Sequence, residues 1–298
     1  MKQLILSLAL LLGTAQAETI RIVVPFAPGG AADQAARVVE RALTTHTQNT
    51  YVIEYRAGAG GAIGANYVAK SRGSETVLLI HSLALVVNSL QADSVYSLVE
   101  FEPVATLGTV QLALITNPKS VVNTMPKILA TRAPVFFGSS GTGAATHVAG
   151  ELFGINTGVN MIHVPYRGEA AALTDILSNN ITVSFTAVGV IKDQSVTVLA
   201  VTGTKRSREF PQVPTLQEQG VRGFEVSPNW LVLLANGTAD QRTLAVIRTA
   251  ISRALAEDPE LFSRIGVDTD RQQLYNTQQF INYERQRVQK ILSRIQIK

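Results

Sequence analysis

Apolar and polar positions along the chain follow two different spacings. Short runs rich in apolar and β-branched residues at Thr19–Val24, Tyr51–Glu54 and Thr76–Ile80 predict strands. Between them, apolar residues recur at helical spacing in 31–43 and in about 63–70, which predicts two helices. The β-α-β-α-β order favours an α/β layer with helices on both faces of its sheet.

The same alternation continues after residue 110 and predicts a second α/β unit. Its expected helices include Ala144–Phe153 and Ala170–Leu177. Its expected strands are Leu112–Thr116, Val135–Phe137, Met161–Val164, Thr182–Phe185 and Val196–Val201.

The end of the chain has a purely helical pattern. Within Gln241–Glu257, four apolar residues share one helical face, namely Leu244, Ile247, Ile251 and Leu255. Thr277 is placed to cap a last helix. No strand is expected between these two helices, so we expect both to pack back onto an existing domain.

The amino terminus has the pattern of a secretory signal peptide. Lys2 supplies a positive charge, Leu4–Leu12 is an apolar run, and Ala15-Gln16-Ala17 fits the small-residue rule for cleavage before Glu18. The alternative, a membrane anchor, needs roughly 20 apolar residues. We therefore expect residues 1–17 to be removed on export.

The composition argues against a cysteine-linked membrane anchor, nucleic-acid binding and a metal site. The chain contains no cysteine, so it forms neither a disulfide nor a lipidated cysteine anchor. Its densest basic stretch, 285–298, falls near the end of the last predicted helix, where cations suit the helix dipole. We expect a solvated helix face there and no nucleic-acid binding. The four histidines lack metal-ligand spacing, so no metal site and no cofactor are expected.

A first glycine loop, Pro25–Gly30, lies between the first predicted strand and helix. Glycine lets a ligand approach the backbone closely, and the start of a helix presents free amides and a positive dipole end. This combination suits an anion such as a carboxylate. The alternative is a tight strand-to-helix turn without a ligand.

A second glycine loop, Ala57–Gly64, follows the second predicted strand. Its glycines do not fit the G-x-G-x-x-G spacing, and no acidic residue closes the next strand, which ends at Ile80-His81-Ser82. A dinucleotide site is therefore not expected.

A third loop, Gly138–His147, offers hydroxyls, open amides and a helix start. It lacks the lysine of a phosphate-binding P-loop. Ser139 or Ser140 with His147 could indicate a hydrolase, but the G-x-S-x-G motif is missing. Hydroxyls that bind a ligand explain the loop with fewer assumptions.

Taken in order, these motifs closely resemble the substrate-binding proteins of tripartite tricarboxylate transporters, the Bug or TctC family. The resemblance extends over essentially the whole chain after residue 17. It rests on Pro25–Gly30 with Asp33, Arg56–Gly64, Gly138–Phe153, His163–Gly168, Leu199–Thr202 and Val213–Thr215.

The resemblance implies a type II periplasmic-binding-protein fold, in which two α/β domains are joined by two crossing strands and close on a ligand in the cleft between them. Domain 1 would comprise residues 18–115 and 229–298, and domain 2 would comprise residues 116–228. The crossings would lie near Leu114–Pro118 and Glu225–Leu233. The protein would be a monomer without catalytic activity.

The resemblance also implies a function. The protein would capture a small carboxylate in the periplasm, whether a mono- or dicarboxylate, an amino acid or an aromatic acid, and deliver it to two membrane subunits of a transporter. A protein of the same fold that presents a solute to a membrane sensor is the alternative. A serine hydrolase that uses Ser139 or Ser140 with His147 is a third hypothesis.

Matched motif by motif, the resemblance assigns ligand contacts to several loops, while Arg167 stays undecided between ligand and solvent. At Thr186-Ala187 the chain departs from an Asp-Asn-type pair common in the family, and 187–198 looks several residues short. We expect the distal end of the pocket to differ there. The assigned residues are Phe26, Ala27, Gly29, Gly30, Gly60, Gly61, Ser82, Ser139, Thr142, His147, Tyr166, Gly168 and Thr186.

Overall fold

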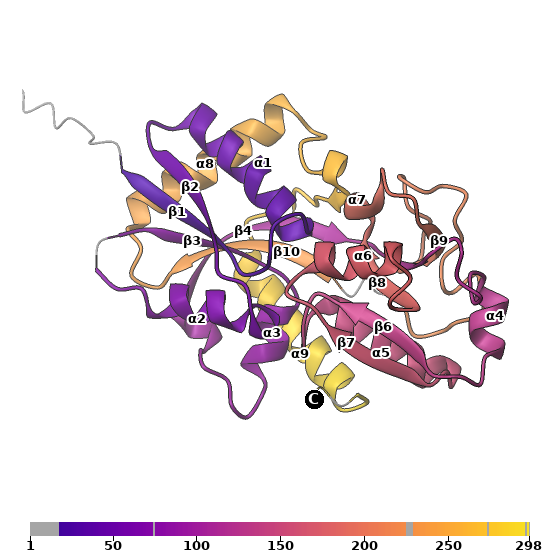
Figure 1. The fold of residues 1–298 in the computed structure, drawn as a ribbon. Helices are drawn as coiled ribbons and strands as arrows, with labels where there is room; N and C mark the ends of the chain where they lie inside the picture. The colour runs from indigo at the N-terminus through magenta and orange to yellow at the C-terminus, as the bar shows by residue number, and fades with distance from the viewer. Residues whose placement is uncertain (1–17, 74, 225–228, 273, 296, 298) are drawn as a thin grey trace, which may run out of the picture.

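The computed structural model describes the chain from Glu18 onward, except residues 74, 225–228, 273, 296 and 298. The predicted signal peptide, 1–17, and the first part of the predicted second crossing lie outside the described residues. Two sheets, each flanked by helices, lie next to each other and form two α/β domains (Figure 1). This confirms the predicted fold class.

The first sheet has the strand order β11-β4-β10-β3-β1-β2. Strands β1, β2 and β3 are parallel, while β10 and β4 run antiparallel to their neighbours. All five residues of β3 are buried, as expected for an apolar run at the centre of a sheet. The strands are β1 Thr19–Val24, β2 Thr50–Tyr55, β3 Val77–His81, β4 Phe101–Val110, β10 Asn229–Asn236 and β11 Val267–Asp268.

The second sheet has the strand order β7-β6-β8-β5-β9. Strands β7, β6 and β8 are parallel, and β5 runs antiparallel to both β8 and β9. The five strands predicted after residue 110 are confirmed here. They are β5 Leu112–Thr116, β6 Val135–Ser139, β7 Met161–Pro165, β8 Val183–Ala187 and β9 Thr197–Val201.

Helices cover both sheets and link their strands (Figure 1). Helices α1 and α8 pack together, and α9 packs on α3 and β4. The two closing helices therefore return to the first domain, as predicted. The helices are α1 Ala31–His46, α2 Ala62–Lys70, α3 Ala84–Ser89, α4 Met125–Ala130, α5 Ala145–Thr157, α6 Glu169–Leu177, α7 Val188–Ile191, α8 Gln241–Glu257 and α9 Thr277–Leu292.

Three sequence expectations need correction. The chain leaves the first sheet at Val110 and enters the second at Leu112, so the first crossing lies before the predicted 114–118 and before the predicted boundary at 115. The tail contains a short strand, β11, which pairs with β4. Thr277 is the first residue of α9, and Asn276 is the cap; the Thr277 hydroxyl accepts from Thr106 Oγ1 and donates to the Leu274 carbonyl, so it caps no helix amide.

Candidate functional site

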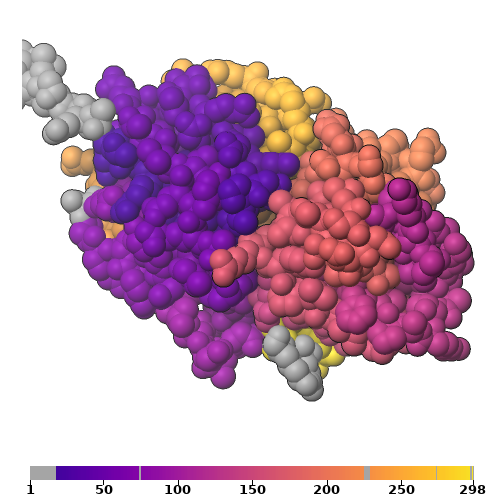
Figure 2. All heavy atoms as spheres, viewed as in Figure 1, coloured from indigo at the N-terminus to yellow at the C-terminus, as the bar shows by residue number. Residues whose placement is uncertain are grey.

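The two domains meet where their strand-to-helix loops face each other, and Figure 2 shows them in contact along this boundary. The amide of Ala27 in the first domain donates a 2.8 Å hydrogen bond to the carbonyl of Arg167 in the second. A Cβ on Gly60 would lie 1.8 Å from the carbonyl oxygen of Thr142, so only glycine permits this approach. The described arrangement is therefore a closed one.

The first glycine loop is held by the helix that follows it. Gly29 has a φ of +93°, a conformation that favours glycine. Its amide donates to Asp33 Oδ2 at 2.8 Å, and Asp33 Oδ1 accepts from the hydroxyl of Tyr55 at 2.7 Å. Asp33 thus fixes the loop against α1 and β2, just before the amide of Ala31, which faces the second domain.

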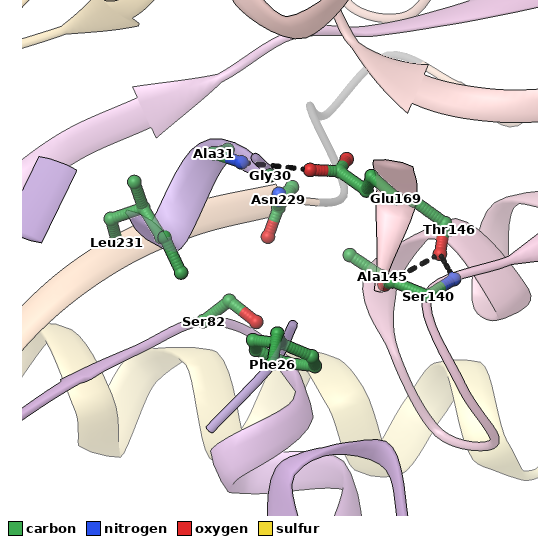
Figure 3. Close-up of a pocket in the computed structure, with 11 residues that line it drawn as sticks. Phe26, Gly30, Ala31, Ser82, Ser140, Ala145, Thr146, Glu169, Asn229 and Leu231 are labelled. Carbon is green, nitrogen blue, oxygen red and sulfur yellow. Dashed lines mark hydrogen bonds between the residues drawn. The ribbon is translucent and has the colours of Figure 1, made fainter. Parts of the chain in front are cut away.

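The amide of Ala31, at the start of α1, already has an anionic partner. Glu169, the first residue of α6 in the second domain, accepts from Ala31 N through Oε2 at 2.9 Å (Figure 3). Its other oxygen, Oε1, accepts from the amide of Ala187 at 2.9 Å. Burial raises the pKa of the Glu169 carboxyl, and the two backbone donors oppose that rise. A carboxylate of the chain itself therefore sits where the first loop was expected to hold a ligand.

A small cavity, called here the α1 cavity, lies beside Glu169 (Figure 3). Its volume of about 20 Å³ has room for little more than one water molecule. The hydroxyl of Thr146 accepts from the amide of Ser140 at 2.9 Å at its edge. Its lining residues are Phe26, Gly30, Ala31, Ala32, Ser82, Ser140, Ala145, Thr146, Glu169, Asn229 and Leu231.

A larger cavity, the glycine-loop cavity, lies between the second and third glycine loops. Its volume of about 380 Å³ falls in the range of small-molecule sites. Both domains line it, with Phe26, Ala57, Gly58, Ala59, Gly60, Gly61 and Ile63 from the first and Ser140, Gly141, Thr142, Pro165, Tyr166 and Arg167 from the second.

Two side chains at this cavity differ in whether another side chain of the protein already binds them. The hydroxyl of Tyr166 donates to Asp175 Oδ2 at 2.6 Å, and burial together with this carboxylate raises the pKa of Tyr166 to about 12. Its hydroxyl is thus committed to a protein acceptor. Arg167 is exposed, and its guanidinium forms no ion pair within the described part of the chain. It is available to an anion in the cavity.

The structure divides the thirteen assigned residues into two groups. Phe26, Gly30 and Ser82 line the α1 cavity, and Phe26 also lines the glycine-loop cavity with Gly60, Gly61, Thr142 and Tyr166. The other six line neither cavity. They are Ala27, Gly29, Ser139, His147, Gly168 and Thr186.

These six residues have structural contacts instead. A Cβ on Gly168 would lie 3.2 Å from Ala27 N, so this pair forms part of the contact between domains. A Cβ on Gly29 would lie 3.2 Å from Ala170, also across the boundary. Thr186 is fully buried in β8, where its hydroxyl lies 3.1 Å from Ser184 Oγ.

The pairing proposed for a hydrolase is not formed. Ser139 is fully buried and its Oγ bonds to His163 Nε2 at 2.6 Å, while Ser140 Oγ bonds to Thr146. His147 instead accepts from the amide of Gly143 through Nδ1 and stacks on His163 with ring centroids 3.6 Å apart. Burial and the neighbouring His147 lower the pKa of His163 to about 3. Ser139 and His147 are therefore packed in the domain interior, whereas Ser140 lies half-buried at both cavities.

His81, at the end of β3, was not assigned from the sequence but shapes the second glycine loop. Its ring packs edge-on against Phe26, with centroids 5.8 Å apart. A Cβ on Gly61, whose φ is +96°, would lie 2.9 Å from the His81 ring. Burial lowers the pKa of His81 to about 4, so the ring is neutral at pH 7.

Sequence reasoning also missed Ser140, Thr146, Glu169, Asn229 and Leu231 as cavity residues. Glu169 directly follows the Tyr166-Arg167-Gly168 motif, which could have directed attention to it. No periodicity could have connected it with Ala31, however, because 138 positions separate the two residues.

Among the described residues, no group of three or more His, Cys, Asp or Glu side chains is placed to hold a metal ion. None of the described helices combines the length and the apolar character needed to cross a membrane.

Comparison with known proteins identifies the family. Residues 35–297 match the model of the "Tripartite tricarboxylate transporter family receptor". The chain belongs to this family. Protein BugT of Bordetella pertussis is 32% identical over 254 residues, which cover 81% of this chain and 78% of that protein. A UPF0065 protein of Pseudomonas sp. strain P51 is 31% identical, covering 83% of this chain and 77% of that protein.

Two solved structures have the same fold. The periplasmic binding protein BugD superposes with a TM-score of 0.83 at 25% identity, covering 92% of this chain and 97% of that chain. R. palustris Rpa4515, solved with adipate, superposes with a TM-score of 0.85 at 25% identity, covering 94% and 98%. The predicted family and the solute-binding function of this receptor are thereby confirmed.

Proposed function

We propose that this receptor captures a small carboxylate in the glycine-loop cavity and releases it to two membrane subunits of a tripartite transporter. One observation carries the proposal: backbone from two glycine loops and Arg167, a cation without an ion-pair partner among the described residues, line a cavity of ligand size between the domains. The adipate in the R. palustris neighbour supports a carboxylate as the ligand class.

The cavity offers donors that suit a carboxylate. The amides of Ala59 and Gly60, just before α2, donate no hydrogen bond within the described residues. Helix starts favour anions, and ordered water can bridge a carboxylate to such amides almost as well as a direct bond. Arg167 adds a charged donor from the second domain, so the ligand would favour the closed arrangement.

The place of action follows from the amino terminus and the family. Members of the family are periplasmic binding proteins. We propose that residues 1–17 direct export, that cleavage before Glu18 releases the receptor into the periplasm, and that it works there as a monomer.

A ligand screen tests the proposal. Native mass spectrometry against mono-, di- and aromatic carboxylates should find one bound ligand per chain. Arg167→Gln should weaken binding by about tenfold or more, because a charge-assisted bond is lost. Arg132→Gln, which changes an exposed arginine elsewhere in the second domain, should bind as the wild type does. Absence of any bound carboxylate in folded protein would refute the proposal.

A further inference from the structure

Glu169 is positioned by contacts that bring the second domain against the first. The preceding residue, Gly168, has a φ of +156° and lies so close to Ala27 that a Cβ would be 3.2 Å from its nitrogen. A Cβ on Gly30 would lie 3.1 Å from Glu169 Oε2. Glycines on both sides of the boundary thus leave room for this side chain to reach the start of α1.

The contacts of Glu169 are those that a bound carboxylate would make at this place. Oε2 accepts from the first amide of α1, on Ala31, and Oε1 accepts from Ala187 at the end of β8. The residue is only 7% exposed. A helix start stabilises an anion through its free amides and its dipole, whether that anion belongs to a ligand or to the chain.

The surroundings leave little room and no counter-charge for a second anion. The α1 cavity beside Glu169 measures about 20 Å³. Among its lining residues Glu169 is the one that carries a charge. A ligand carboxylate placed here would lie next to a buried like charge in a region where charges are weakly screened, which is unfavourable.

We propose that Glu169 is a specificity-determining residue: it fills the anion position at the start of α1, so the receptor takes a solute with one carboxylate and rejects a second carboxylate at this end. The inference rests on the proposed function, since the single ligand carboxylate is bound at the glycine-loop cavity. The end of the solute that faces the α1 cavity then carries no second carboxylate.

Matched acids test the inference by calorimetry. Wild type should bind hexanoate or butyrate at least tenfold more tightly than adipate or succinate, which have the same chain lengths. Glu169→Gln should reduce this ratio at least tenfold through a gain in dicarboxylate affinity. Glu218→Gln, an exposed site in the second domain, should keep the wild-type ratio. Equal or tighter dicarboxylate binding by wild type, or a ratio unchanged in Glu169→Gln, would overturn the inference.

A second readout needs no ligand, so failure of the proposed function would not hide the result. Because the chain lacks cysteine, Val99→Cys and Val121→Cys, 89% and 86% exposed, allow a dye on each domain. Glu169→Gln in this labelled protein should raise the open-to-closed ratio about tenfold, because a charge-assisted hydrogen bond between domains is weakened. A distance distribution identical to that of the labelled parent would contradict the role of Glu169 at α1.

Discussion

Glu169 Oε2 lies 2.9 Å from the amide nitrogen of Ala31 and accepts its hydrogen bond across the domain boundary. The first glycine loop is therefore a contact between domains as well as a border of the cleft. The closed arrangement of the two domains is already stabilised by contacts within the chain. A bound ligand adds its own contacts to these. Its affinity depends on how much more strongly it binds the closed arrangement than the open one.

Gly60→Ala should weaken ligand binding by at least about tenfold, because the added Cβ would lie 1.8 Å from the Thr142 carbonyl of the other domain. Only opening of the domains relieves this clash. Titration calorimetry with the best carboxylate would measure the loss.

Gly73→Ala is the matched control for Gly60→Ala. Gly73 also has a positive φ, +93°, but a Cβ there would meet no atom of the described residues beyond its chain neighbours within 4 Å. Both variants share the conformational cost of about 1 kcal/mol in unfolding free energy, whereas only Gly60→Ala should lose affinity. Equal affinities for the two variants would show that the Gly60–Thr142 approach does not govern closure.

Acidification should destabilise the protein through His81. Burial lowers its pKa to about 4, whereas the unfolded side chain titrates near 6.5. Below pH 6.5 the unfolded chain binds the proton first, so the unfolding free energy falls as pH drops from 6.5 toward 4, by about 3 kcal/mol at the limit.

The control variant for this prediction is His81→Gln, whose side chain cannot take up a proton. Urea unfolding at pH 7 and pH 4.5 should show a smaller loss of stability in the variant than in wild type. The variant keeps His163, whose pKa is lowered to about 3, so some pH dependence should remain. Parallel pH profiles for the two proteins would rule out His81 as a source of acid sensitivity.

The docking of α9 on the first domain depends on Glu284. This 3% exposed carboxylate accepts from the indole nitrogen of Trp230 at 2.6 Å and pairs with Arg287. Glu284→Ala should lower the unfolding free energy by about 3 kcal/mol, because it leaves buried donors without a partner. Gln289→Ala, on the exposed side of α9, should change it by less than about 0.5 kcal/mol. A small loss for Glu284→Ala would mean that α9 docks through apolar contacts alone.

Local patterns predicted most of the fold. Apolar runs such as Thr76–Ile80 and Leu112–Thr116 revealed their strands, but a run does not say which sheet it joins. The first crossing was therefore placed too late. The sequence pattern did not predict strand β4, because Pro103 and Gly108 interrupt Phe101–Val110. Both residue types are uncommon within strands.

The candidate site was predictable only where local sequence defines it. Glycine loops indicate close backbone approach, and within such a loop the family resemblance assigned Gly60 and Gly61. Glu169 could not, because its partner Ala31 is set by the packing of two domains. The same holds for Ser139, whose actual partner, His163, comes from a neighbouring strand.

A crystal structure of the receptor with its tightest-binding carboxylate tests the central claim most directly. We expect the ligand carboxylate in the glycine-loop cavity, within hydrogen-bond distance of the Gly60 amide and Arg167, with Glu169 still bonded to Ala31. A ligand carboxylate bound to Ala31 with Glu169 displaced, or a ligand outside the boundary between the domains, would contradict it.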